Sequence, residues 1–326
     1  MLCRSRASIY IYISIWYILI SIYVWHVLRM FWSSFVYMLY WWILCVYWFI
    51  EYNEKDPKIE KLYEYLSRLT SEAYKDEFLI SNITFSKQES NDRILEIYLT
   101  GEPPPNISLF YKIKKLFLYL VKNFIDWTFL VITAIFHKIS KQKFSIKNEN
   151  ELILVDTYFV ITQIFERGEF EDIFFPGLSE YLTKRKKNYA YIPRWFGSRQ
   201  PFGLFRVFRI IKEQQIPVLT QYQVLSLSDY VKALRFVILY PFSLFRFMKK
   251  IGSSYEGNLI HYALWAVFDG GIIEHYVRFL FGQRLSSIIP ERIKCLSWYE
   301  SIAAEKSFYL GLRTIPGKTK IIGAQL

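Results

Sequence analysis

The sequence predicts an α/β protein with a parallel sheet, preceded by transmembrane helices at its amino terminus. Two observations predict this class. Short apolar segments alternate with longer amphipathic ones from Glu151 to Leu326, and this alternation is typical of a parallel sheet with crossover helices. Residues 1–50 instead form two long apolar runs without an acidic side chain. We expect the chain to divide after residues 50, 107 and 148.

The composition limits the classes of function. Of the 326 residues, 53% are hydrophobic and 20% are aromatic, both high for a soluble protein. The formal net charge of +12 favours an anionic partner, either a membrane surface or nucleic acid. Cys3, Cys45 and Cys295 are too far apart to indicate a disulfide framework or a zinc site. We therefore expect neither a metal nor a cofactor.

Residues 1–50 are predicted to form a transmembrane helical hairpin. The runs Ser8–Leu28 and Met30–Ile50 are each about twenty residues long, enough for a helix to cross a hydrocarbon core of roughly 30 Å. A hairpin returns the chain to the side where it began, and the basic residues on both flanks favour the cytoplasm. We expect a membrane protein whose soluble domain lies on the cytoplasmic side. Alternatively, the repetitive opening precedes the true start, at Met30 or later.

Residues 51–107 are predicted to be a small soluble α/β segment that ends in a proline-rich linker. Apolar residues recur at helical spacing among charges over Lys58–Ser71, which predicts an amphipathic helix. Ile94–Leu99 is predicted to be a short strand. The following Gly101–Pro105 interrupts both kinds of structure.

Residues 108–148 are predicted to form basic amphipathic helices at a membrane interface. This segment carries eight lysines against one acid, Asp126, and therefore a net charge of +7. Its apolar centre, Leu116–Phe136, contains only Lys122 and Asp126 as charges. An interfacial helix would turn its lysines toward acidic lipid headgroups. The residues expected at the membrane are Lys112, Lys114, Lys115, Lys138, Lys141 and Lys143.

Three alternatives remain for this basic segment. A third full span is possible, although a charge at mid-membrane costs a few kcal/mol. A buried amphipathic hairpin without a membrane role is also possible. Nucleic acid is the rival partner for the lysines, but their neighbours are mostly large apolar side chains and no nucleic-acid-binding motif is present. We therefore expect a lipid membrane as the partner and no nucleic acid.

Residues 149–326 are predicted to alternate strands and helices around a parallel sheet. The expected strands are Leu152–Asp156, Tyr189–Ile192, Val218–Leu219 and the two strands of a final strand-helix-strand unit, Arg292–Ala324. The expected helices are Leu178–Lys187, Phe202–Gln214, a long helix that begins at Ser228, and Asn258–Gln283. Ligands of parallel sheets bind outside the carboxyl ends of the strands, so we expect a cleft there.

Common catalytic motifs are absent from the sequence. There is no glycine-rich phosphate loop, no His-Glu-x-x-His zinc site and no Gly-x-Ser-x-Gly elbow. His261, Asp269, Glu274 and His275 lie on or beside one predicted helix and could transfer protons. A lone polar residue on a helix is, however, usually an ordinary polar residue without a catalytic role.

The last thirty residues carry the most specific pattern. An apolar strand runs into Trp298-Tyr299-Glu300, a helix opens near Glu305-Lys306, and a second strand ends at Gly323-Ala324-Gln325. This pattern resembles Glu-Asn-Gln-x-Trp-Glu-Lys followed by Ile-Gly-x-Gln-His. It is typical of bacterial capsule and lipopolysaccharide biosynthesis proteins of the GT-B glycosyltransferase type. The resemblance extends over about Glu151–Leu326.

The resemblance implies a Rossmann-like acceptor-side domain, which is the amino-terminal half of a GT-B fold. The positions that match the pattern and are expected to bind substrate are Glu300, Glu305, Lys306, Gly323 and Gln325. Together with His275, the two glutamates are the candidates for catalysis. The two glutamates could equally stabilise a helix start through its dipole.

The sequence also departs from the pattern. Ser301 and Ile302 replace Asn-Gln, Ala304 replaces the tryptophan, and Leu326 stands where the histidine is expected. The donor domain is missing, so the chain is expected to be truncated at Leu326 and inactive on its own.

Three functions follow from these features. We favour a membrane-associated glycosyltransferase-like protein of surface-polysaccharide biosynthesis, whose partners would be a nucleotide-sugar and a glycan acceptor if the chain is complete. The alternative is a non-catalytic membrane protein that serves as a scaffold or binding partner in the same pathway. The third is a protein that binds membranes or nucleic acid through its basic segment.

Overall fold

The computed structural model describes residues 60–62, 64, 67, 96–101, 103–104, 106–139, 151–197, 201–251, 254–266, 268, 271–289, 292–298 and 303–324. The chain divides into two compact units, Met1–Glu64 and Tyr65–Leu326. The predicted transmembrane hairpin, 1–50, lies outside the described residues.

Two predictions for the segment 51–107 can be compared with the structure. Residues 60–62, 64 and 67 are helical, within the predicted amphipathic helix. Residues 96–100 are also helical, so the strand predicted at Ile94–Leu99 is wrong. Six residues are too few to distinguish a period of 2 from a period of 3.6. The buried Tyr98 ring packs against the Tyr255 ring at 6.0 Å between centroids, which places this turn against a helix.

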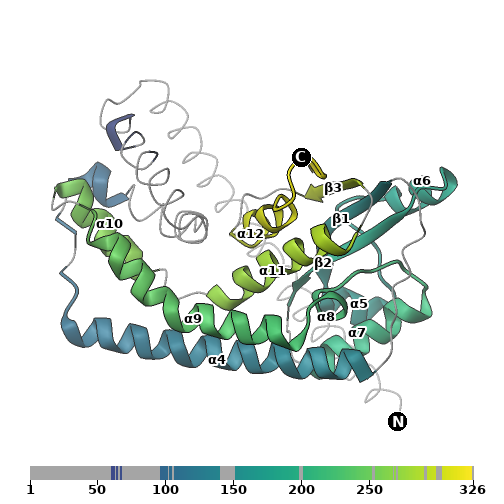
Figure 1. The fold of residues 1–326 in the computed structure, drawn as a ribbon, viewed down its shortest axis with the longest axis horizontal. Helices are drawn as coiled ribbons and strands as arrows, with labels where there is room; N and C mark the ends of the chain where they lie inside the picture. Colours follow the sequence, from purple (N-terminus) through teal and green to yellow (C-terminus); the bar gives the residue numbers. More distant parts are fainter. Residues whose placement is uncertain are drawn as a thin grey trace, which may run out of the picture. The chain divides into compact units, whose positions relative to one another are not determined.

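A four-stranded parallel sheet forms the centre of the second unit, within the described part of the chain, and confirms the α/β class (Figure 1). Its strands are β1 (Glu151–Val160), β2 (Tyr189–Phe196), β3 (Arg292–Trp298) and β4 (Thr319–Ala324). Their order is β2-β1-β3-β4. The chain moves outward in one direction from β1 to β2 and in the other from β3 to β4. The topological switch point therefore lies between β1 and β3.

The register places polar residues side by side at this switch point. Asp156 of β1 is opposite Ile192 of β2 and Ser297 of β3. Neighbouring residues of a parallel sheet point to the same face, so Asp156 and Ser297 share one face. We predicted that β1 ends at Asp156, but it continues to Val160. The acid therefore lies inside the strand and is completely buried.

The described helices are α4 (Leu109–Ile139), α5 (Ile161–Arg167), α6 (Leu178–Lys184), α7 (Pro201–Glu213), α8 (Gln221–Val224), α9 (Leu227–Met248), α10 (Tyr255–Ala266), α11 (Ile272–Ile288) and α12 (Ala303–Leu312). Where one helix was predicted at Asn258–Gln283, the structure has α10 and α11. The pair Gly270-Gly271 precedes α11, and glycine interrupts helices readily. The strand predicted at Val218–Leu219 is a single bridge from Val218 to Tyr191.

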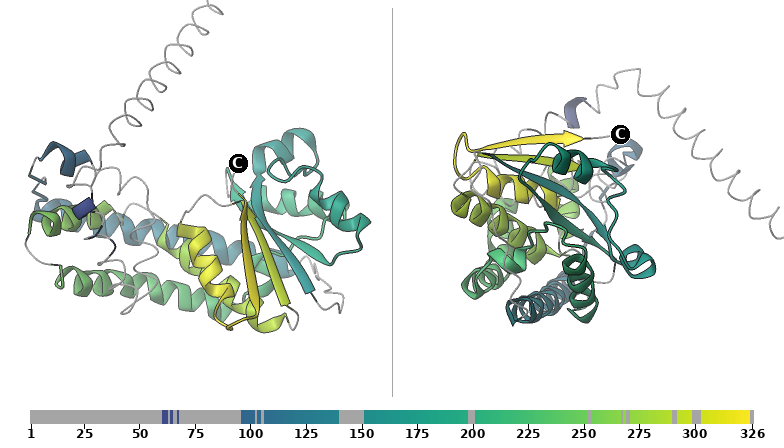
Figure 2. Two further views of the ribbon diagram at one scale, coloured as in Figure 1. Left: turned by 90° about the horizontal axis from the view of Figure 1, so that it is seen from above. Right: turned by 90° about the vertical axis from the view of Figure 1, so that its right-hand side faces the viewer.

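Helices cover both faces of the sheet (Figures 1 and 2). On the face of Asp156, α11 and α12 pack against the strands, and Arg278 of α11 binds Asp156 directly. On the opposite face, Phe159 stacks on Phe170 at 4.0 Å between ring centroids. Trp195 meets Phe208 of α7 on that same face, at 5.5 Å. Burial on both faces explains why β1 is almost continuously apolar.

Helices α11 and α12 touch through two glycines, Gly282 and Gly311. A Cβ at Gly311 would collide with the carbonyl oxygen of Phe279 and approach the Gln283 nitrogen to 2.8 Å. Only glycine therefore allows the two backbones to approach this closely.

We expect Gly311→Ala to reduce the free energy of unfolding by roughly 1–3 kcal/mol, because the added methyl group meets rigid backbone. Chemical denaturation would measure the change. The matched control is Gln283→Ala, at an exposed position of the same contact region, which should change stability by about 0.5 kcal/mol or less. Equal stability of the two variants would contradict the close approach.

The amino terminus of α9 is held by Asp229. Its carboxylate accepts hydrogen bonds from the Ser226 backbone nitrogen at 3.0 Å and from two nitrogens of Arg284 at 3.1 Å each. Burial alone would raise the pKa of Asp229, but the hydrogen bonds from Arg284 and Ser226 lower it overall. A lowered folded-state pKa stabilises the protein above the unfolded pKa of about 4, and this contribution is lost as the pH falls through the folded value.

We expect Asp229→Asn to lower stability by about 1 kcal/mol above pH 5, a modest amount because the Arg284 side chain is 41% exposed. The difference from the wild type should shrink as the pH falls below about 4, first because the unfolded chain takes up the proton and then, at lower pH, because the folded-state carboxylate does. Unfolding titrations at several pH values would measure it. A difference that stays constant down to pH 2 would show that ionisation of Asp229 contributes nothing.

Candidate functional site

Four charged side chains meet between the sheet and the helices α11 and α12, at the switch point of the sheet. They are Asp156 of β1, Arg194 of β2, Arg278 of α11 and Glu305 of α12, called here the ion-pair cluster. All four are at most 6% exposed. Two acids and two arginines compensate one another, as buried charges require.

Asp156 is the centre of the ion-pair cluster. Its Oδ1 accepts a hydrogen bond from Arg278 Nη2 at 2.9 Å and lies 3.5 Å from Arg194 Nε. Its Oδ2 accepts a hydrogen bond from the Ser297 hydroxyl at 3.3 Å, and Tyr309 Oη lies 3.4 Å away. One carboxylate therefore connects β1, β2, β3, α11 and α12.

Arg194 connects the cluster to the carboxyl end of β3. Its Nη1 binds Glu305, and its Nη2 donates to the Trp298 carbonyl oxygen at 2.6 Å. Its guanidinium carbon lies 4.1 Å from the centre of the Tyr158 ring, a cation–π contact. Burial by itself would lower the pKa of Arg194, but Asp156 and Glu305 raise it overall. The guanidinium therefore stays charged.

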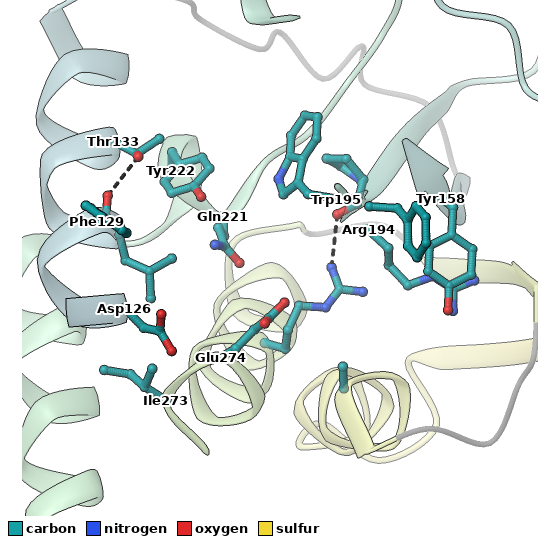
Figure 3. Close-up of a pocket in the computed structure, with 15 residues that line it drawn as sticks. Asp126, Phe129, Thr133, Tyr158, Arg194, Trp195, Gln221, Tyr222, Ile273 and Glu274 are labelled. Atoms are coloured by element: carbon teal, nitrogen blue, oxygen red, sulfur yellow. Dashed lines mark hydrogen bonds between the residues drawn. The ribbon is translucent and has the colours of Figure 1, made fainter. Parts of the chain in front are cut away.

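Beside this cluster lies a cavity of about 330 Å³. Its wall comes from α4, the ends of β1 and β2, α8, the first two turns of α11 and the first turn of α12. Figure 3 shows Asp126, Gln221 and Glu274 turned toward the space between α4 and α11. The lining residues are Asp126, Phe129, Leu130, Thr133, Tyr158, Pro193, Arg194, Trp195, Phe196, Gln221, Tyr222, Ile273, Glu274, Arg278 and Ala304. Such a cavity, apolar with a few polar groups, is typical of a small-ligand site.

The inward face of α4 carries polar residues. The side-chain oxygen of Asn123 accepts a hydrogen bond from the Ile273 nitrogen at 3.0 Å, at the first turn of α11. Asp126 lies at the same helix end, because a Cβ on Gly271 would be 3.6 Å from its Oδ2. A carboxylate is favourable there because of the helix dipole. His137, further along α4 and also buried, packs edge-on against the Phe208 ring of α7 at 4.9 Å between ring centroids.

The outward face of α4 is apolar. We use this name for a set of side chains that are all 40% or more exposed: Phe117, Leu118, Leu120, Val121, Phe124, Ile125, Ile135 and Phe136. By length and composition Leu109–His137 could cross a membrane, with a mean hydropathy of 1.5, and most of that stretch is not buried. A soluble helix normally buries its apolar face and exposes its polar one. Helix α4 buries apolar residues such as Tyr119 and Ala134 against the core, and it also exposes a second apolar set on its outward face.

Helix α9 lies beside α4 and continues this pattern (Figure 1). The Tyr119 hydroxyl of α4 donates to the Val237 carbonyl at 2.8 Å, and Trp127 Nε1 of α4 donates to the Tyr230 carbonyl at 2.9 Å. Their order shows that the helices are antiparallel. Beyond its first turn, the exposed residues of α9 are either apolar or basic: Val231, Lys232, Arg235, Ile238, Leu239, Phe242 and Arg246.

Three of the residues predicted to bind substrate, Glu305, Lys306 and Gly323, are among the described residues. Glu305 is completely buried in its ion pair with Arg194. Lys306 and His275 are half-buried, and Gly323 is exposed on β4. Glu300, Gln325 and Asp269 lie outside the described residues. Of the proton-transfer candidates on α10 and α11, Glu274 lines the cavity.

The lysines predicted to contact a membrane are only partly described. Lys114 is exposed, while Lys112 and Lys115 are half-buried. Lys112 Nζ lies 5.6 Å from the Trp265 ring centre of α10. Lys141 and Lys143 lie outside the described residues, as does the side chain of Lys138. No group of three or more potential metal ligands occurs among the described residues.

Sequence reasoning missed the two arginines of the ion-pair cluster. Arg194 follows the predicted end of β2 at Ile192, so it was not assigned to the sheet. Arg278 interrupts the apolar run Val277–Phe281, and this interruption is the feature of the sequence that could have revealed it. A lone arginine in an apolar helix segment indicates a buried pair.

Comparisons with models of protein families, with curated proteins and with solved structures found no match to this chain. The fold and site therefore define a class only: an α/β protein with a four-stranded parallel sheet in its described part, and a long helix whose apolar face is exposed.

We expect Asp156→Asn to destabilise the protein by about 3–5 kcal/mol, because it leaves two buried arginines with only one carboxylate. Thermal or chemical unfolding would measure the change. The matched control is Glu213→Gln, which breaks the exposed 2.9 Å pair with Arg209 and should cost less than about 1 kcal/mol. Comparable losses in the two variants would contradict a central role of Asp156.

Proposed function

We propose that this protein works at a membrane surface, where α4 and α9 are embedded in the interface and support the α/β domain. The single observation that carries this proposal is the exposed apolar face of α4, which turns outward while the polar Asn123, Asp126 and His137 lie inward. Hydrocarbon is the solvent in which such a helix is favourable. The predicted hairpin at residues 1–50 would anchor the same chain.

The charges near this surface favour a bilayer over a second protein. The exposed charged residues of α4 and α9 are all basic among those described: Lys114, Lys122, Lys232, Arg235 and Arg246. Basic side chains beside an interfacial apolar face attract acidic lipid headgroups.

An interfacial position suits α4 better than a full span. Helix α4 packs against α7, α8, α9 and α11, so a span would carry charged neighbours into the hydrocarbon. The alternative of a buried hairpin without a membrane role leaves the outward face of α4 unexplained.

For activity, we propose a glycosyltransferase-like protein of surface-polysaccharide biosynthesis with a Rossmann-like domain on the cytoplasmic side. The resemblance at the carboxyl terminus and a cavity beside the ends of β1 and β2 support it. The non-catalytic alternative, a scaffold in the same pathway, is favoured by one specific observation: Glu305 is sealed in an ion pair and cannot reach a substrate in this conformation.

The membrane proposal is tested with the full chain in vesicles that contain a lipid with a photoreactive acyl chain. We expect lipid adducts on peptides of α4 between Phe117 and Phe136. Phe124→Glu should lower the adduct yield on α4 by about tenfold, because a charge facing hydrocarbon costs a few kcal/mol. Phe124 is 55% exposed, so the melting temperature should stay unchanged.

Ile173→Glu is the matched control, because Ile173 is a 43% exposed apolar residue in the loop between α5 and α6. It should leave the adducts on α4 unchanged. Crosslinks from α4 to the segment 1–50 or to a second copy, without lipid adducts, would replace the bilayer with a protein partner and refute the proposal.

A further inference from the structure

A second cavity, of about 550 Å³, lies at the edge of the sheet formed by β2. Its wall comes from the start of β2, the loop between α5 and α6, α6 itself and the loop that follows α7. Tyr191 of this wall alternates along β2 with Ile192, which shares a face with Asp156, so the second cavity lies on the opposite face of the sheet. Its volume is within the range of small-molecule sites, roughly 300–1,000 Å³.

Asp172 lies in the wall of the second cavity, and only one of its two carboxylate oxygens is satisfied. Its Oδ1 accepts hydrogen bonds from the Thr157 hydroxyl at 3.1 Å and from the Phe174 and Phe175 nitrogens at 3.0 and 3.1 Å. Its Oδ2 is buried and has no hydrogen-bond partner in the described part of the chain. Because Asp172 is only 8% exposed, bulk water cannot replace that partner.

Asp172 also lacks the counter-charge that other buried acids of this protein have. Asp156, Asp229 and Glu305 each bind at least one arginine. Asp172 is as buried as a paired acid, yet it forms no ion pair with any described residue. Burial raises the pKa of Asp172, and the hydrogen bonds to Oδ1 offset this effect only in part. A positive charge beside Oδ2 would favour the ionised carboxylate.

The other charges of the described wall compensate one another. Glu171 forms an ion pair with Arg167, which lies outside the wall. Glu180 and Lys184, both exposed on α6, contribute one charge of each sign. The charge of an ionised Asp172 is therefore the one that stays unbalanced in this part of the chain. A ligand with a single positive charge would balance it, whereas a phosphate or carboxylate would be repelled.

The apolar part of the wall is aromatic and contains Phe170, Phe175, Tyr189 and Tyr191. The Tyr191 ring lies 5.4 Å from the Phe170 ring and 6.0 Å from the Tyr189 ring, at interplanar angles of 73° and 83°. The faces of aromatic rings attract organic cations. A metal ion would need several oxygen ligands, and no group of three or more potential metal ligands occurs among the described residues.

We propose that the second cavity binds a compact organic ammonium ion. The ammonium group donates a hydrogen bond to Asp172 Oδ2, and the rings of Tyr189 and Tyr191 contact the rest of the ligand. Because Oδ2 is itself enclosed, binding requires a side-chain rotation in the wall, and such rotamer changes are common on binding. The site does not depend on the membrane association proposed above.

The test uses the full chain in micelles of an uncharged maltoside detergent, with benzylammonium as the probe and isothermal titration calorimetry as the measurement. Benzyl alcohol and benzoate are the matched neutral and anionic ligands. We expect saturable binding of benzylammonium, at least about tenfold weaker binding of benzyl alcohol, and no binding of benzoate. Asp172→Asn should weaken binding of benzylammonium about tenfold, because a charge-assisted hydrogen bond is lost. An asparagine still accepts the hydrogen bonds made to Oδ1, so the melting temperature should change little.

Two further variants complete the test. Tyr189→Leu keeps an apolar side chain but removes a ring, and it should weaken binding about threefold. The control is Glu169→Gln, an exposed glutamate of the same loop outside the wall of the second cavity, which should bind like the wild type. The proposal is overturned by a wild type that shows no saturable binding of benzylammonium, or by equal affinities of the wild type and Asp172→Asn. Equal binding of benzyl alcohol and benzylammonium would also overturn it, because Asp172 would then act as a neutral hydrogen-bond donor.

Discussion

The second unit of this protein depends on one buried carboxylate, Asp156. It lies at the switch point of the parallel sheet, where the chain runs outward in one direction from β1 and in the other from β3. The chain does not pass directly from β1 into α11 or α12, so side chains have to connect them. Arg278 and Arg194 supply that link from α11 and β2. An apolar side chain at this position could be buried without any charged partner, but it would not fix the positions of the two arginines. We infer that the ion-pair cluster determines which way α11 and α12 face, and therefore where the cavity wall stands.

The two ends of α11 are held by different kinds of contact, and this difference leaves room for the cavity. Near its carboxyl end, Gly282 brings the backbone into contact with α12 and allows no free space. At its amino end, Asn123 of α4 accepts a hydrogen bond from the Ile273 nitrogen, with Asp126 nearby. Polar groups that meet across a helix end keep α4 and α11 apart by the length of their side chains. A cavity with carboxylates in its wall results.

The sequence predicted the strands and helices of residues 149–326 well, because apolar runs and turn residues are local signals. It predicted the candidate site poorly, since the site is made by pairing between distant segments. Asp156 and Arg194 are neighbours only through the β1–β2 register, and Arg278 joins them from a helix more than eighty residues further along. Glu305 was singled out by a terminal motif, but its exposure depended on Arg194, which no local pattern could reveal.

Helix α4 shows most directly what a single polar residue says about a helix. Asp126 counted against a full membrane span because a charge in hydrocarbon is costly. In the structure Asp126 faces the first turn of α11, so its charge is held by protein, and the outward face of α4 contains no acid among its residues. The cost of an inward charge is independent of what covers the opposite side of the helix. The acid that penalised a membrane helix is therefore compatible with an interfacial one, because α4 needs only one of its faces to be apolar.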